Sequence, residues 1–90
     1  MAKLIFTESY EKRARKFFKH HQQFLKQYEK TLKLLELNPL HASLRLHKLR
    51  GKKADIYSVS INLSYRITID FIIEKDTIIP IDIGSHPEVY

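Results

Sequence analysis

The sequence contains no cysteine and no long apolar run, and both absences exclude classes of protein. Without cysteine the chain has no disulfide, no thiolate nucleophile and no zinc site with cysteine ligands. No apolar stretch approaches the roughly 20 residues that span a bilayer as a helix, and the first residues lack the apolar core of a signal peptide. We therefore expect a soluble, cytoplasmic protein without a membrane partner.

The spacing of a metal site is missing as well. The histidines are His20, His21, His41, His47 and His86. They form neither an H-E-x-x-H motif nor an H-x-x-x-H pair, which would direct two imidazoles from one helical face toward a metal. We therefore expect no metal and no other cofactor.

The length limits how the chain is organised. With 90 residues there is room for one modest hydrophobic core. The sequence has no internal repeat, no low-complexity segment and no linker. This predicts a single domain over residues 1–90, so any functional site must be built on the fold itself.

The charge is positive overall and unevenly distributed. Residues 1–53 contain 14 Lys/Arg and 4 Asp/Glu, a net charge of +10, whereas residues 54–90 contain 2 and 6, a net charge of −4. A basic surface attracts polyanions, so nucleic acid is one candidate partner and an acidic protein is another. The third interpretation is a solvated basic surface that only maintains solubility.

Two stretches have the apolar periodicity of amphipathic helices. The first begins after Thr7, a suitable N-cap, with Glu8 in the first turn. Its apolar stripe consists of Tyr10, Ala14, Phe17 and Phe18. The stripe of the second consists of Leu25, Tyr28, Leu32 and Leu35. Asn38 and Pro39 end the second helix, because a residue before proline is disfavoured in the helical conformation.

The periodicity then changes to that of strands. Residues 57–73 alternate between apolar side chains at odd positions and mostly polar ones at even positions. This length exceeds the usual range of about 3–10 residues, so two strands joined by a turn are predicted. The alternation continues in phase through the turn, which favours an odd-length loop such as Asn62–Leu63–Ser64.

Three further strands and the fold class follow. Residues 3–6 and 44–49 have strand character, and residues 77–84 form the last strand after a turn at 74–76. Pro80 indicates an edge position or a bulge in that strand. The order predicts an α+β domain: an N-terminal strand, a helical hairpin and an antiparallel β-meander that packs its odd face on the helices. The polar even face is then expected to be open, with Arg66 among short side chains.

A few residues could carry chemistry. Arg66 offers a planar donor fork for phosphate oxygens, unless it only pairs with an acid such as Asp70. His86 could transfer protons near neutral pH or be an idle surface residue. Tyr90 could donate from its phenol or only fix the tail to the core. The basic stretch that could contact phosphates comprises Arg45, His47, Lys48, Arg50, Lys52 and Lys53.

Together these features resemble a known family. The order of elements, Leu49 to Gly51 before a strand, Tyr65-Arg66-Ile67 in the central strand, and Gly84-Ser85-His86 near an acidic residue are similar to the RelE/ParE superfamily of toxin–antitoxin toxins. The similarity covers nearly the whole chain and is strongest to the branch that includes RelE and YafQ.

The resemblance implies a metal-independent endoribonuclease that enters the ribosomal A site and cuts messenger RNA. By position, Arg66 would stabilise the phosphate, His86 and His47 would be catalytic histidines, and Tyr90 would be the terminal aromatic residue. We expect these groups to converge on one side of the sheet. The implied RNA-binding residues are Arg45, Lys48, Arg50, Lys52 and Lys53. An acidic antitoxin that forms a hetero-oligomer with the toxin is the implied protein partner.

One departure leaves the mechanism open. Ser58 and Ser60 stand where RelE has lysines, and a serine is neither a base nor a cation at neutral pH. Either a histidine transfers the proton while Lys52 or Lys53 supplies the charge, or the nuclease activity is weak. Members of the ParE type instead poison DNA gyrase without the catalytic residues, and such a binding toxin is the alternative function.

Overall fold

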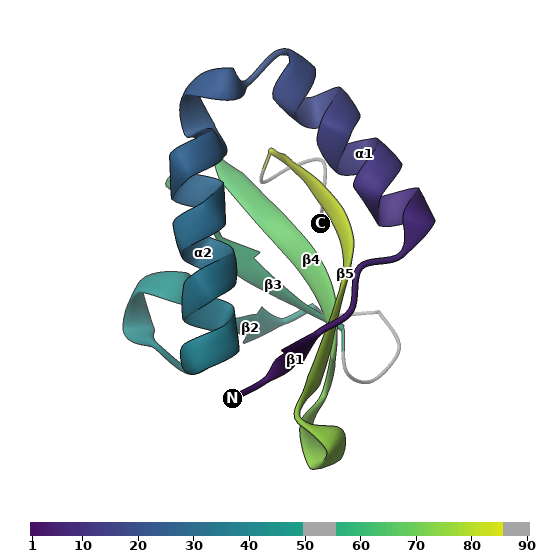
Figure 1. Ribbon diagram of the computed structural model, residues 1–90. Coiled ribbons are helices and arrows are strands. Elements are labelled where there is room, and N and C mark those ends of the chain that lie inside the picture. The colour runs from purple at the N-terminus through teal and green to yellow at the C-terminus, as the bar shows by residue number, and fades with distance from the viewer. Residues whose placement is uncertain (50–55, 86–90) are drawn as a thin grey trace.

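The structure is a computed structural model that describes residues 1–49 and 56–85 (Figure 1). In chain order, its elements are β1 (Lys3–Leu4), α1 (Glu8–Lys19), η1 (Gln22–Phe24), α2 (Leu25–Leu37), η2 (Ala42–Leu44), β2 (His47–Lys48), β3 (Ile56–Ser60), β4 (Tyr65–Ile72), η3 (Ile73–Lys75) and β5 (Thr77–Ser85). No helix in these two ranges has both the length and the apolar composition of a membrane span.

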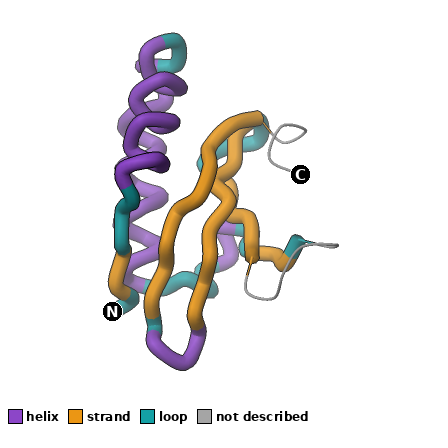
Figure 2. The backbone as a smooth tube through the Cα atoms, turned by 90° about the vertical axis from the view of Figure 1, so that its right-hand side faces the viewer, coloured by secondary structure: helices purple, strands orange, loops and turns teal. Residues whose placement is uncertain are grey.

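The strands form one sheet in the order β1-β5-β4-β3-β2. β2 to β5 are an antiparallel meander, and β1 pairs in parallel with β5, which makes the sheet mixed. Both helices cover the same face of the sheet, so the molecule has two layers (Figure 2). The predicted α+β class, with a helical hairpin on a β-meander, is confirmed.

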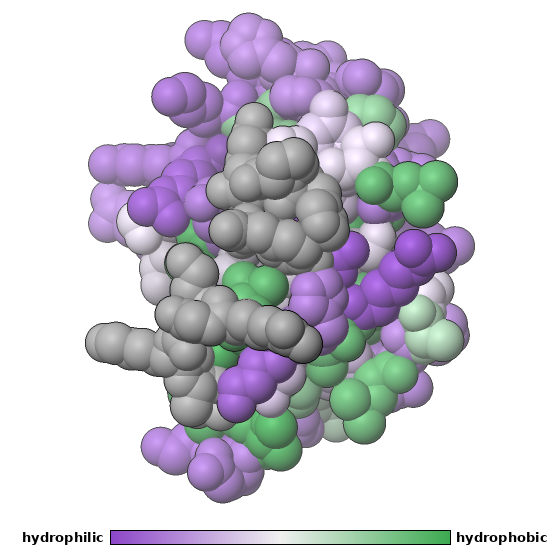
Figure 3. Space-filling view, turned by 180° about the vertical axis from the view of Figure 1, so that it is seen from behind, coloured by the Kyte–Doolittle hydropathy of each residue, from purple (hydrophilic) through white to green (hydrophobic). Residues whose placement is uncertain are grey.

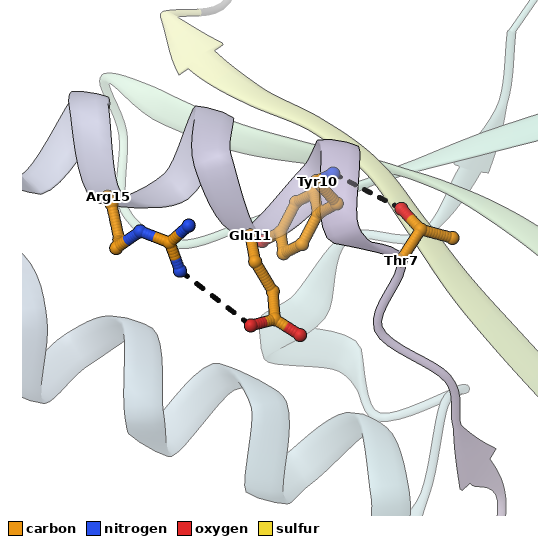
Figure 4. Close-up of polar contacts among 4 residues, drawn as sticks. All are labelled: Thr7, Tyr10, Glu11 and Arg15. Atoms are coloured by element: carbon orange, nitrogen blue, oxygen red, sulfur yellow. Dashed lines mark hydrogen bonds and ion pairs between the residues drawn. The ribbon is translucent and has the colours of Figure 1, made fainter.

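α1 begins and α2 ends where their flanking residues predict. Thr7 has an extended backbone, and its hydroxyl accepts a hydrogen bond of 3.1 Å from the backbone N–H of Tyr10 (Figure 4). This satisfies one of the free N–H groups of the first turn. On the exposed surface of the same helix, Glu11 and Arg15 form an ion pair of 3.8 Å. α2 ends at Asn38, as its proline neighbour predicts.

The hairpin between β3 and β4 has the predicted three-residue loop. Ser60 pairs with Arg66, and the N–H of Ile61 donates to the carbonyl of Tyr65 at 2.9 Å, which leaves residues 62–64 as the loop. The side chain of Asn62 accepts hydrogen bonds from the backbone N–H groups of residues 64 and 65. Because the loop is odd in length, even residues face even residues across the hairpin.

The core lies between the odd face of the sheet and the helices. Among its fully buried members are Tyr10, Leu35, Val59, Ile67, Ile69 and Ile78, none more than 1% exposed. They come from both helices and from β3, β4 and β5, so the two layers share one apolar interior. The odd-position residues Leu63 and Ile73 are exposed because they lie in the turns.

A β-bulge interrupts β5 beside Pro80, which confirms the interpretation of that proline. Ile69 pairs with Pro80 but Thr68 pairs with Asp82, so Ile81 is an extra residue. The guanidinium of Arg13 on α1 donates to the carbonyl of Ile81 at 3.0 Å. Because Ile81 is an extra residue, even positions of β5 face the helices before the bulge and odd positions face them after it. Asp82 therefore lies on the polar face.

The predicted strand over residues 44–49 is wrong in extent, since β2 contains only His47 and Lys48. The chain before it forms the short 3-10 helix η2, which Arg45 ends in the left-handed conformation with φ 49°. Residues in this conformation cannot continue a strand. The backbone instead turns at Arg45 and enters the sheet only at His47.

Candidate functional site

The candidate site lies on the sheet face opposite the helices. The register places four polar residues opposite one another across the sheet, one on each of β2, β3, β4 and β5. They are His47, Ser58, Thr68 and Asp82. Residues that pair directly in a sheet share a face, so the four side chains form one polar row. Arg66 lies two residues before Thr68 and thus on the same face.

Arg66 connects three segments of this face. Its Nε–H donates to the hydroxyl of Ser58 on β3. Its Nη2 donates to the backbone carbonyl of Arg45 at 3.0 Å and lies 3.4 Å from Nδ1 of His47. The guanidinium, which starts from β4, therefore crosses β3 and reaches the segment that carries β2.

The expectation that this face is open is wrong. Ser58, Ser60, Arg66 and Thr68 are 0%, 8%, 7% and 8% exposed. The side chain of Arg66 itself extends past Ser58 toward the segment before β2, which contributes to this burial. A buried guanidinium needs hydrogen-bond acceptors to offset its lost hydration, and within the described part of the chain Arg66 reaches three of them. From behind, hydrophilic side chains follow the upper and left margins of the molecule, and hydrophobic ones gather at the lower right (Figure 3).

The backbone of Arg45 is in the left-handed conformation, and its carbonyl contacts Arg66. A non-glycine residue in the left-handed region is uncommon, and such conformations persist where the surrounding structure holds them. Here the carbonyl of Arg45 accepts a charge-assisted hydrogen bond from the buried guanidinium. The left-handed turn thereby places the next residues, including His47, against the end of the Arg66 side chain.

The site residues proposed from the sequence fall into three groups: residues that come together, one residue on the other face of the sheet, and residues outside the described ranges. Arg66, the backbone of Arg45 and the ring of His47 come together. Lys48 pairs with Tyr57, so its side chain starts from the other face of β2. The remaining candidates lie outside the described residues, and they are Arg50, Lys52, Lys53, His86 and Tyr90.

Sequence reasoning missed Asp82 as a member of the polar row. Without the bulge, Asp82 would pair with Ile67 and face the helices, because the register from Ile72–Thr77 would continue unbroken. Pro80 was the available signal for the bulge. The carboxylate of Asp82 accepts a hydrogen bond of 2.9 Å from the backbone N–H of Ile83. Within the described residues, no three His, Asp or Glu side chains are grouped so that they could hold a metal ion.

A groove on the helical side is the other surface feature of note. Its volume is about 290 Å³, and it is lined by Phe6, Tyr10, Glu11, Ala14, Arg15, Phe18, Leu25 and Tyr28. The hydroxyls of two lining residues, Tyr10 and Tyr28, are 2.8 Å apart and buried. Burial raises the pKa of both phenols above the ordinary value. Phe6 and Leu25, at 41% and 43% exposure, leave an apolar rim in contact with solvent.

Comparisons with known proteins agree on the architecture. YafQ from E. coli superposes with a TM-score of 0.78 at 13% sequence identity, covering 100% of this chain and 99% of YafQ. A copper-bound mutant toxin from Helicobacter pylori matches with a TM-score of 0.69 at 25% identity, covering all of both chains. The chain has the RelE-like toxin fold.

A third RelE-like structure is that of the YoeB–YefM complex from Staphylococcus aureus. It matches with a TM-score of 0.70 at 18% identity, covering 96% of this chain and 98% of the matched chain. No protein-family model and no curated protein sequence matches this chain. At these identities the similarity shows the fold, and the function has to be argued from the site.

Proposed function

We propose that this chain is the toxin of a toxin–antitoxin system and that it cleaves messenger RNA on the ribosome without a metal. Two observations support the proposal. The whole chain shares its fold with YafQ, and a buried arginine on the central strand contacts the ring of His47. An arginine and a histidine held together on a rigid sheet are the groups that RNA cleavage by an internal nucleophile needs.

The reaction begins when the 2′-hydroxyl of a nucleotide attacks the adjacent phosphorus. Its proton passes to a base, the bond from phosphorus to the 5′-oxygen breaks, and an acid protonates the departing oxygen. Arg66 stabilises the negative charge that develops on the phosphate oxygens. His47 and His86 are the candidates for hydrogen-bond donation and proton transfer, and Tyr90 is the terminal aromatic group beside them.

The proposed protein partner is an acidic antitoxin. Structures with this fold include the DinJ–YafQ and YoeB–YefM complexes. The basic amino-terminal part of the chain favours a partner of opposite charge, and association should then weaken as salt increases. An amphipathic helix could lie in the groove between α1 and α2, or a strand could add to a sheet edge, forming a hetero-oligomer. Ribosomes are the proposed target, which places the activity in the cytoplasm.

A gyrase-binding toxin is the second candidate function. The observation that favours it is the burial of Arg66, whose Nε and Nη2 already have partners within the protein. Ser58 and Ser60 in the positions of expected lysines point the same way. A toxin of this type would trap gyrase on DNA and leave translated messages intact.

Growth assays in cells distinguish catalytic from structural roles. The double variant Arg66→Ala, His86→Ala should relieve toxicity, because loss of a charge-stabilising or proton-transferring group commonly costs about 10² to 10⁴ in rate. Arg13→Ala is the matched control, since it removes an arginine that also donates to a backbone carbonyl at 3.0 Å but lies on the helical side. Full toxicity of a folded double variant would reject the proposed nuclease, and gyrase–DNA complexes in those cells would favour the second function.

A further inference from the structure

Ser58 is the residue that orients Arg66. Its hydroxyl is fully buried and accepts the Nε–H of the guanidinium. Since Nε lies in the rigid plane of the guanidinium, a bond at this atom restricts rotation of the whole group. The plane is then held from its other end, where Nη2 meets the carbonyl of Arg45.

The contact between Arg66 and His47 decides where the imidazole carries its proton. A guanidinium has only donors, so Nδ1 of His47, 3.4 Å from Nη2, must accept with its lone pair. A neutral imidazole that accepts at Nδ1 has its N–H at Nε2. His21 provides the opposite case in the same molecule, because its Nδ1 lies 2.8 Å from the carbonyl of Phe17 and must donate.

The geometry points to Ser58 and Arg66 as positioning residues that hold His47 in the tautomer with its proton on Nε2. The functional consequence rests on the proposed nuclease: a neutral His47 then offers the substrate a hydrogen-bond donor rather than a base. Proton removal from the 2′-hydroxyl falls to another group, for which His86 is the candidate.

This assignment also explains the chemistry at position 58. The Nε–H of Arg66 needs an acceptor, which a serine hydroxyl supplies. A lysine at this position has only donors and would place a second cation against a buried guanidinium, at a cost in Coulomb repulsion and desolvation. Ser58 is therefore suited to positioning an arginine, a role that a lysine at this position could not fill.

Nitrogen–proton correlation NMR of the isotope-labelled chain tests the tautomer. Spectra are recorded at a pH well above the ordinary histidine pKa of about 6.5, because the test concerns the neutral form of imidazole. We expect Nδ1 of His47 to have the shift of an unprotonated nitrogen and Nδ1 of His21 that of a protonated one. We also expect a sharp, slowly exchanging Nε–H signal from Arg66. A protonated or averaged Nδ1 at His47 would overturn the assignment.

Three variants test the part of Ser58. Ser58→Ala should broaden the Arg66 Nε–H signal, move His47 toward a tautomer mixture and slow RNA cleavage about 10- to 100-fold through misplacement of the guanidinium. Ser58→Thr, which keeps the hydroxyl, should restore all three. Ser60→Ala is the matched control, since it deletes a similarly buried hydroxyl on the same strand and face that donates to the carbonyl of Asn62 instead.

The outcomes separate the two proposals. If the spectra of Ser58→Ala and Ser60→Ala match that of the wild type, Ser58 does not position Arg66. If Ser58→Ala does not fold, the positioning of His47 is still tested by its tautomer in the wild type and by the spectrum of Ser58→Thr. If the tautomer responds as expected while the wild-type protein leaves RNA intact, the positioning holds and the nuclease function fails.

Discussion

The buried hydrogen bond between Tyr10 and Tyr28 should make these two residues strongly coupled in stability. Their hydroxyls are 2.8 Å apart, and the side chains are 1% and 9% exposed. The bond joins α1 to α2 across an apolar groove. Removal of one hydroxyl therefore leaves the other in a largely apolar environment with little access to water.

The magnitude follows from this burial. Tyr10→Phe should lower the free energy of unfolding by roughly 1–3 kcal/mol, the cost of an unsatisfied buried polar group. Tyr28→Phe should cost at least as much, because it orphans the hydroxyl of Tyr10, which is the more deeply buried of the two residues. The double phenylalanine variant has no orphaned hydroxyl, so its loss should be smaller than the sum of the single losses by about 1 kcal/mol or more. Each kcal/mol corresponds to about 4–8 °C in Tm for a chain of this size.

The same pair predicts a dependence on alkaline pH. Burial is the largest cause that raises the pKa of Tyr10 and of Tyr28 above the ordinary value of 10.0. Above pH ~10 the unfolded chain loses these protons while the folded chain retains them. The free energy of unfolding should then decrease as pH rises above this value, and the decrease should be smaller in the double variant.

Urea unfolding of the four proteins, at neutral pH and above pH ~10, provides the measurement. The variants Tyr10→Phe, Tyr28→Phe and the double variant complete a double-mutant cycle with the wild type. Additive losses at neutral pH would refute the buried hydrogen bond. Equal alkaline losses in the wild type and in the double variant would refute the proposed titration.

Three further changes test the fold. Thr7→Ala should lower the free energy of unfolding by about 1 kcal/mol through loss of the N-cap, measured by urea unfolding, and an unchanged midpoint would contradict the capping role. Asp76 has φ 48°, so Asp76→Val should destabilise by about 1–2 kcal/mol while Asp76→Gly should not, and equal midpoints would refute the backbone argument. Deletion of Ile81 should turn Asp82 toward the helices and abolish cooperative thermal unfolding, whereas a wild-type transition would show that the bulge is dispensable.

The regular elements could be predicted from the sequence because their signals are local. Thr7 and Asn38 bound the helices by their own backbone and side-chain preferences. The alternation over residues 57–73 sets both the strands and the odd length of their loop. Each of these features depends on residues a few positions apart, so the local sequence is sufficient to predict the helix ends, the strands and the loop length.

The details of the polar face depend on contacts between distant segments. Burial of Arg66 is possible because Ser58 and the carbonyl of Arg45 accept hydrogen bonds from its N–H groups. The left-handed turn that presents this carbonyl occurs at a non-glycine residue, so the sequence contains no glycine that would predict it. Pro80 indicated an edge or a bulge without fixing the extra residue. The membership of Asp82 in the polar row therefore became evident only from the register of β4 and β5.

The proposed function requires that the polar face around Arg66 cleaves RNA during translation. Primer extension on a message translated in vitro in the presence of the protein tests it most directly. We expect breaks within translated codons with the wild-type chain and with Arg13→Ala, about 10²-fold or more fewer breaks with Arg66→Ala, and no breaks on the same RNA without ribosomes. An intact message with folded wild-type protein, or equal cleavage by Arg66→Ala, would contradict the claim.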